Sequence, residues 1–312
     1  MTKFCGLELA HPVINASGTF DAIAARRAFG DELLGPPGGD GRGSGFPFSA
    51  FVSKTVTLAP RSGNSPPRLW ELPSGLLNSI GLPNKGLAGY LEHDLPELAL
   101  LPVPLIVNVM GFALAEVAEL VEAFAARAEV AALELNVSCP NVETGLVMGA
   151  DPVETARLVR EVRPLTSKPI IVKLTPNASD PAAVAEAAEA EGADSVSLVN
   201  TLRGMARHPR TGEPWLGGRT GGVSGPAIRA IALAQVDGVA ARVRIPIIAM
   251  GGLQSGRDAF ELLSAGATLV AVGTESFRDP AAGARIAREL GKMSAATDAS
   301  ATAAGRHGVS AT

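Results

Sequence analysis

The stretch Ala131-Ala-Leu-Glu-Leu-Asn-Val-Ser-Cys-Pro-Asn141 changes character partway along its length. It begins as a short apolar run, which is typical of a buried strand, and Pro140 ends any further strand pairing. From Asn136 onward the side chains are amide, hydroxyl and thiol groups, so one end of the strand belongs in a core and the other at a site. Cys139 then lies on a loop beyond a rigid strand, where a reactive group is useful. A lone cysteine is more often an inert, buried small hydrophobe, so its spacing alone leaves both interpretations open.

The same succession of apolar run, polar or glycine-rich turn and alanine-rich helical stretch recurs along the chain. Further strands are predicted at residues 12–18, 50–54, 105–108, 169–174, 195–200, 246–250 and 269–272. Helices are predicted at residues 20–29, 114–127, 151–163, 180–191, 226–241, 257–264 and 280–292. This alternation predicts an α/β fold, a (β/α)8 TIM barrel over residues 1–293. A doubly wound open sheet is the alternative, but Asn15-Ala-Ser-Gly18 is not the glycine-rich turn that such a fold normally places first.

Four segments do not follow this succession. Residues 57–85 form a long irregular segment and residues 202–225 a second long excursion, and such loops are usually lids or binding loops. We therefore expect insertions at the C-terminal mouth of the barrel. Residues 35–47 are rich in Gly and Pro and predict a flexible surface loop on the face away from the mouth. Residues 294–312 offer almost nothing to bury and predict a disordered tail.

Composition excludes several classes of function. Hydrophobic residues make up 46% of the chain but aromatic residues only 4%, so the core must be built from Ala, Val, Leu and Ile. A net charge of −4 gives no reason to expect nucleic acid or an anionic membrane surface. The 2 cysteines and 4 histidines show neither a disulfide framework nor metal-ligand spacing, so no metal is expected. No apolar run reaches the ~18 residues of a membrane span and no signal peptide is evident, which predicts a cytoplasmic protein.

If the fold is a barrel, the C-terminal ends of its strands meet at one mouth, where the sites of this fold lie. The polar and glycine residues expected there are Ser17, Lys54, Asn108, Asn136, Cys139, Lys173, Asn200, Thr201, Gly251, Gly252, Gly273 and Thr274. Either lysine taken singly is typical of a solvated rim residue, but two of them among amides indicate an anionic ligand. Each amide offers a donor and an acceptor, which suits a planar heterocycle with imide and carbonyl edges.

The glycines after the last two strands indicate a phosphate. Met250-Gly-Gly252 and Val272-Gly-Thr274 leave backbone N–H groups accessible at the position where barrels often bind phosphate, although two tight turns would also need glycine. Phosphate at one side of the mouth and amides at its centre predict a phosphorylated ring cofactor, and FMN has that shape. A lysine near the flavin pyrimidine edge would stabilise the reduced ring.

Several motifs, taken together, resemble those of class 1 dihydroorotate dehydrogenases. They are residues 136–141 (NVSCPN), 15–18 (NASG), 53–57 (SKTVT), 78–84 (NSIGLPN), 172–176 (VKLTP), 200–205 (NTLRGM), 221–226 (GGVSGP), 250–252 (MGG) and 272–274 (VGT). The resemblance covers roughly residues 5–290. It implies an FMN-bearing barrel that oxidises (S)-dihydroorotate to orotate in pyrimidine (UMP) synthesis, with Cys139 as the catalytic base. A cysteine base implies class 1, because the membrane-bound class 2 enzymes use serine and carry an N-terminal extension.

Within class 1, residues 200–205 are similar to the 1B type. That resemblance implies a homodimer core paired with an FAD and iron–sulfur subunit in a heterotetramer that passes electrons to NAD⁺. The 1A type, a homodimer that reduces fumarate, usually has Ser where this chain has Thr201. The chain has no cysteine cluster, so any iron–sulfur centre must lie on the partner.

The resemblance also implies a role for each matching position. Substrate would be bound by Lys54, Asn78, Ser79, Ile80, Gly81, Leu82, Asn136, Asn141, Asn200 and Thr201. FMN would be lined by Ser17, Lys54, Thr55, Asn108, Asn136, Lys173, Val199, Gly225, Gly251, Gly252, Gly273 and Thr274. Residues 142–149 would form the mobile loop that closes over the substrate and excludes water.

Two alternative functions stay open from the residues. A Schiff-base barrel aldolase would use Lys173 as nucleophile and a phosphate site, but it would leave Cys139 and the amides without a role. An FMN-dependent pyrimidine-base reductase would share the flavin and the cysteine, but it would not need Lys54 for a carboxylate.

Overall fold

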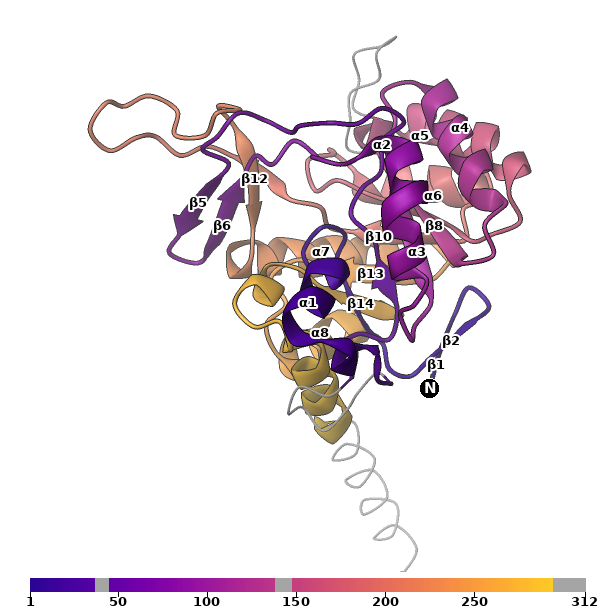
Figure 1. The fold of residues 1–312 in the computed structure, drawn as a ribbon. Coiled ribbons are helices and arrows are strands. Elements are labelled where there is room, and N and C mark those ends of the chain that lie inside the picture. Colours follow the sequence, from indigo (N-terminus) through magenta and orange to yellow (C-terminus); the bar gives the residue numbers. More distant parts are fainter. Residues whose placement is uncertain (37–44, 138–147, 294–312) are drawn as a thin grey trace, which may run out of the picture.

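The computed structural model describes residues 1–36, 45–137 and 148–293. Its main sheet has eight parallel strands in the order β3-β14-β13-β10-β9-β8-β7-β4. Their bounds are β3 Val13–Asn15, β4 Phe51–Val52, β7 Leu105–Val109, β8 Val130–Asn136, β9 Ile170–Lys173, β10 Ser195–Leu198, β13 Ile247–Met250 and β14 Leu269–Val272. Each strand coincides with a predicted one, and the predicted (β/α)8 barrel is confirmed (Figure 1).

The seam between β3 and β4 is closed by a side chain where a backbone ladder is missing. Asn15 is fully buried, donates from Nδ2 to the Val52 carbonyl at 2.8 Å and accepts from the Val52 N–H at 2.8 Å. The Ser49 N–H also donates to the Val13 carbonyl at 3.1 Å. The first and last strands of the order therefore meet, and the doubly wound open sheet is wrong.

Helices alternate with the strands around the outside. They are α1 Ala22–Phe29, α4 Leu114–Ala125, α5 Pro152–Val162, α6 Pro181–Ala190, α7 Arg229–Ala240, α8 Gly256–Ser264 and residues 282–293. Asp151 and Asp180 cap α5 and α6 through backbone N–H groups, each followed by a proline at the first position. Between β4 and β7 lie α2 Gly86–Gly89, the π-helical turn Tyr90–Asp94 and α3 Leu95–Leu98, which the sequence had not predicted. Short 3₁₀ turns cover Asp31–Leu34, Met148–Ala150, Arg163–Leu165, Pro226–Ile228 and Thr274–Phe277.

The barrel strands are apolar on both faces, and the two faces build two cores. Ile106, Ala132, Ile171 and Ile248 belong to a cluster inside the barrel, whereas their neighbours in the chain, such as Val107, pack under the helices. Because strand side chains alternate, residues two positions from an inward one also point inward. Polar residues two or four positions after these interior residues therefore also point inward, and they lie at the C-terminal mouth.

An N-terminal hairpin closes the other end of the barrel. Strands β1 Thr2–Phe4 and β2 Leu7–Leu9 pair antiparallel, and Phe4 and Leu9 are buried in the interior cluster with Ile14. The hairpin had not been predicted, because its strands are only 3 residues long each. It acts as an apolar plug at that end of the barrel.

The two long insertions are not wholly irregular, which corrects the sequence-based expectation. They pair with each other in a four-stranded sheet of order β11-β12-β6-β5. The bounds are β5 Leu69–Leu72, β6 Gly75–Asn78, β11 Leu202–Gly204 and β12 Gly221–Ser224. Figure 1 shows β5, β6 and β12 projecting to one side of the barrel, away from the N-terminal hairpin. Trp70 of β5 packs on Trp215 with ring centroids 4.5 Å apart, which ties the sheet to the loop between β11 and β12.

Most of the predicted flexible loop at 35–47 lies outside the described residues, as does the predicted tail. Near the end of that loop, however, Phe46 is fully buried and makes edge-to-face contacts with Phe20, Phe48 and Phe51. The expectation of a surface loop is therefore wrong at this position. Burying an aromatic side chain in the core stabilises the fold more than leaving it in water would.

Candidate functional site

The strand ends at the mouth carry buried polar groups where the sequence predicted them. Asn108 follows Ile106 on β7, and Asn136 and Lys173 are register partners at the ends of β8 and β9. Asn108 is fully buried and the Lys173 side chain is only 6% exposed, whereas Lys54 is exposed at the rim. The two predicted lysines therefore differ: Lys173 presents a desolvated charge, and Lys54 a solvated one.

Beneath these groups lies a buried carboxylate that sequence reasoning missed. Glu134 Oε2 accepts from Asn108 Nδ2 at 2.5 Å and lies 4.0 Å from Lys173 Nζ. Its Oε1 accepts from the Ser197 hydroxyl at 2.6 Å. The signal was present in the sequence, because a charged residue inside an apolar strand is buried only where it finds partners.

The insertions bring the second group of predicted residues to the same mouth. Asn78 ends β6 and donates from Nδ2 to the Gly222 carbonyl of β12 at 3.1 Å. Gly222 packs so closely on Thr201 that a Cβ atom there would lie 1.9 Å from Oγ1. The Thr201 N–H donates to Asn200 Oδ1 at 2.8 Å, so Asn78, Asn200 and Thr201 belong to one connected unit. Ser79, Ile80, Gly81 and Leu82 follow β6 directly and are half-buried.

The predicted phosphate-binding glycines come together near the start of α7. Gly251 and Gly252 have φ of 127° and 77°, a region that favours glycine. A Cβ on Gly251 would lie 2.9 Å from Val199 Cγ2, and one on Gly252 would lie 3.0 Å from the Arg229 nitrogen. Across this turn, a Cβ on Gly225 would lie 3.4 Å from Thr274 Cγ2. Backbone N–H groups beside a helix start suit an anion.

The remaining cofactor candidates lie on the β3 and β4 side of the mouth. Ser17 donates to the Ser53 carbonyl at 2.8 Å, and Thr55 is buried just past β4. A Cβ on Gly18 would lie 3.9 Å from Lys54 Cγ, and one on Gly273 would lie 3.8 Å from the Ala16 Cβ. All described candidates therefore lie around one end of the barrel.

Cys139 and Asn141, together with residues 142–147 of the predicted closing loop, lie outside the described residues. The flanks are fixed. Val137 is buried, and its carbonyl accepts from the Gly149 N–H at 2.7 Å. Met148 and Gly149, the last two residues of the predicted closing loop, are buried as well.

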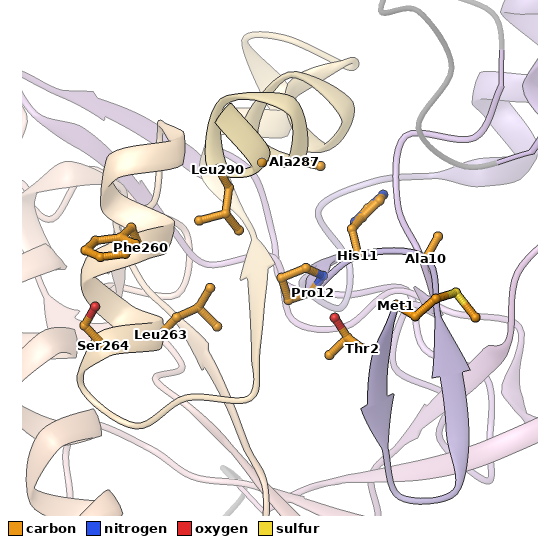
Figure 2. Close-up of a pocket in the computed structure, with 11 residues that line it drawn as sticks. Met1, Thr2, Ala10, His11, Pro12, Phe260, Leu263, Ser264, Ala287 and Leu290 are labelled. Carbon is orange, nitrogen blue, oxygen red and sulfur yellow. The ribbon is translucent and has the colours of Figure 1, made fainter. Parts of the chain in front are cut away.

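A surface cavity of about 430 Å³ lies at the other end of the molecule (Figure 2). It is lined by Met1, His11 and Pro12 near the start of β3, and by Phe260, Leu263 and Leu290. Because sites of this fold lie at the C-terminal ends of the strands, this cavity is separate from the candidate site.

Residues 1–36, 45–137 and 148–293 show neither a membrane-spanning helix nor a metal-binding cluster. None of their helices combines the length and apolarity that crossing a bilayer requires. No group of three or more His, Cys, Asp or Glu side chains among them is arranged to hold a metal ion.

Comparison with known proteins assigns the family. Residues 1–293 match the family described as dihydroorotate dehydrogenase. The chain belongs to the dihydroorotate dehydrogenase family. The predicted resemblance is thereby confirmed, and the aldolase alternative is set aside.

The relatives indicate the type within the family. A protein of Geobacter sp. (strain M21) named dihydroorotate dehydrogenase B (NAD⁺), catalytic subunit, is 45% identical over 287 residues, covering 91% of this chain and 90% of the relative. Proteins of the same name from Citrifermentans bemidjiense and Bacillus pumilus are 44% and 43% identical, covering 91% and 93% of this chain and 90% of each relative. These relatives support the NAD-linked 1B type, and catalytic subunits of this family are FMN-binding flavoenzymes of pyrimidine biosynthesis.

The described residues fit FMN on their own chemistry. Asn108 Oδ1 is buried with no hydrogen-bond partner in the described part of the chain, so it needs an N–H or O–H donor from a ligand. Lys173 supplies a desolvated positive charge, and the turns at Gly225, Gly252 and Thr274 lie close together beside the start of α7, a position that suits a phosphate. A ring that carries both N–H donors and carbonyl acceptors, joined to a phosphate tail, satisfies all three.

Proposed function

We propose that this chain oxidises (S)-dihydroorotate to orotate at the C-terminal mouth of the barrel, with Cys139 as the base. The observation that carries the proposal is the grouping of Lys54, Asn136 and the Asn78–Thr201 unit at one mouth. A carboxylated pyrimidine needs a cation for its carboxylate and amides for its imide and carbonyl edges.

Substrate binding is assigned to the rim and the insertions. Lys54 is exposed at the end of β4 and is the cation available to a ligand that enters from solvent. Asn78, Asn136, Asn200 and Thr201, with the 79–82 segment, supply the polar groups around the pyrimidine edges, and Asn141 orients the ring beside the base. Because insertions from two parts of the chain form this rim, ligand contact depends on their pairing through β6 and β12.

The chemistry requires the loss of two hydrogens from adjacent carbons. The proton at C5 lies next to a carbonyl and needs a base, which a thiolate at Cys139 provides. FMN, when bound, accepts the hydride from C6. FMN would be held by Ser17, Thr55, Asn108, Lys173, Val199 and the turns at Gly225, Gly251, Gly252, Gly273 and Thr274. Lys54 and Asn136 would lie between FMN and the substrate and contact both. The loop from residue 142 to 149 would exclude water from the reacting atoms.

The relatives' name, catalytic subunit, supports a separate electron-transfer subunit. We assign to that subunit the FAD and iron–sulfur groups that pass electrons to NAD⁺, in a heterotetramer around a homodimer of this chain. The reaction takes place in the cytoplasm in this proposal.

Replacing each cysteine in turn tests the base. Cys139→Ala should keep bound FMN and lose at least about 100-fold in turnover of dihydroorotate with an artificial acceptor, the lower end of what a positioned base contributes. Cys139→Ser should be slow at neutral pH and recover as pH rises, because a hydroxyl is a weaker acid. Cys5→Ala, at the half-buried cysteine of the N-terminal hairpin, is the control and should turn over like the wild type. A Cys139→Ala protein as active as the control would contradict the assignment.

A further inference from the structure

A buried carboxylate lies inside the barrel, below the groups assigned to FMN. Glu134 lies two residues after the interior residue Ala132 on β8, so its side chain also points inward, and it is only 2% exposed. Leu, Ile or Val would pack at this position without any cost in desolvation. A buried carboxylate costs several kcal/mol unless partners compensate for the lost water.

Three other strands of the barrel supply those partners. The Ser197 hydroxyl of β10 donates to Oε1 at 2.6 Å, and Asn108 Nδ2 of β7 donates to Oε2 at 2.5 Å. Lys173 Nζ of β9 lies 4.0 Å from the same Oε2, which is the limit of an ion pair. Both oxygens of Glu134 therefore face groups that touch, or lie next to, the assigned cofactor site.

These contacts have two consequences for a ligand at the mouth. First, because Asn108 turns its Nδ2 toward Glu134, its Oδ1 is left as an acceptor, and that atom is the buried one with no partner in the described ranges. Second, the carboxylate offsets the charge of Lys173, so the interior has a net charge near zero where a lone ammonium would give +1. Because Lys173 Nζ and Glu134 Oε2 are 4.0 Å apart and shielded from water, the electrostatic energy between them is large compared with thermal energy.

We propose that Glu134 is a positioning residue that fixes the Asn108 amide and lowers the flavin reduction potential by offsetting Lys173. The inference rests on the proposed placement of FMN against Asn108 and Lys173. Reduction adds negative charge to the flavin, and an ammonium nearby favours the reduced form. A carboxylate paired with that ammonium reduces this preference, so removing its charge raises the potential.

The test is Glu134→Gln, which removes the charge at nearly the same size, keeps an acceptor for Asn108 Nδ2 and turns an N–H donor toward the Ser197 hydroxyl, which can accept in place of donating. The midpoint potential of bound FMN is measured by equilibration with a reference dye in the absence of substrate. We expect at least a tenfold shift toward reduced FMN at a fixed potential, which is about 30 mV for this two-electron couple. Glu122→Gln, on the exposed face of α4, is the matched control and should leave the potential unchanged.

A second variant separates charge from packing. Glu134→Gln/Lys173→Met removes both charges, so its potential should fall again below that of Glu134→Gln. If Glu134→Gln alone fails to fold, the double variant should recover the folded state and its stability, because an uncompensated buried ammonium is what destabilises the single variant. A failure of the double variant to recover them would overturn the proposal.

The outcomes distinguish this inference from the proposed function. A Glu134→Gln protein that binds FMN with an unchanged or lower potential overturns the role of Glu134 and leaves the assigned reaction intact. A wild-type chain purified without flavin, and unable to bind added FMN, overturns both. Because the potential is measured without dihydroorotate, the result is independent of Cys139.

Discussion

At the scale of single residues, the feature with the largest structural consequence is Asn15. Its amide makes both hydrogen bonds that a neighbouring strand would otherwise make to Val52. The Val52 N–H and carbonyl are buried, so water cannot replace the hydrogen bonds that Asn15 makes to them.

Asn15→Ala should therefore destabilise the barrel by about 2–4 kcal/mol, because two buried backbone groups lose their partners. Urea unfolding at neutral pH measures the change. Ser49→Ala is a graded control at the same seam, since the Ser49 N–H still donates to the Val13 carbonyl, and it should cost about 1 kcal/mol. Equal losses for the two variants would show that Asn15 is not what closes the barrel.

At the scale of elements, the four-stranded insertion sheet determines whether the substrate rim exists. Strand β12 lies between β6 and β11, and its Gly222 is opposite Asn78 in the ladder and in contact with Thr201. The absence of a side chain at Gly222 allows this approach, so the sheet and the end of β10 are mutually positioned.

Gly222→Ala should raise the KM for dihydroorotate at least about tenfold, which corresponds to ~1.4 kcal/mol of lost binding, while bound FMN is retained. The added Cβ would lie 1.9 Å from Thr201 Oγ1, so Thr201 must move. Gly238→Ala in α7 is the control, because a Cβ there meets nothing within 4 Å. Steady-state kinetics and flavin absorbance measure both effects, and an unchanged KM would separate Thr201 from the substrate.

At the scale of the whole molecule, stability depends on a histidine at the end opposite the site. His11 precedes β3 and accepts from the Val13 N–H through Nδ1 at 3.3 Å, and its Nε2 is buried without a partner in the described ranges. Burial, and secondarily the N-terminal ammonium, lowers the pKa of His11 from its ordinary 6.5 to about 4. The folded state thus favours the neutral imidazole.

The sign of the pH dependence follows from that shift. Neutral His11 makes its full contribution to the free energy of unfolding above about pH 6.5. This contribution is lost as the pH falls toward 4, because His11 in the unfolded chain takes up a proton at a higher pH than in the folded protein. Between pH 7 and 4.5 the wild type should lose about 2.5 kcal/mol more free energy of unfolding than His11→Asn, which keeps an acceptor for Val13. Parallel losses in urea titrations of the two proteins would contradict the shifted pKa.

The electron acceptor is also a property of the whole assembly. The chain carries no glycine-rich dinucleotide fingerprint, and the mouth assigned to FMN is rimmed by the substrate insertions. The isolated chain should therefore oxidise dihydroorotate with a small dye and reduce NAD⁺ negligibly, and an FAD and iron–sulfur subunit should restore NAD⁺ reduction. Rapid NAD⁺ reduction by the pure chain would refute the need for a partner, and good turnover with fumarate would indicate the 1A type.

Local chemistry along the chain was enough to predict the barrel and most of the mouth. The eight strands have the length and apolarity of buried parallel strands, and each ends in polar or glycine residues, so their order and the positions of Asn108, Asn136 and Lys173 followed from sequence. Tertiary structure alone decided the closure by Asn15, the hairpin that plugs the barrel, the sheet formed by the insertions and the buried partners of Glu134. These features join residues far apart in the chain, and the hairpin and the insertion sheet do so through strands too short or too rich in glycine for periodicity to reveal. The free energy of all these contacts exists only once the chain has folded.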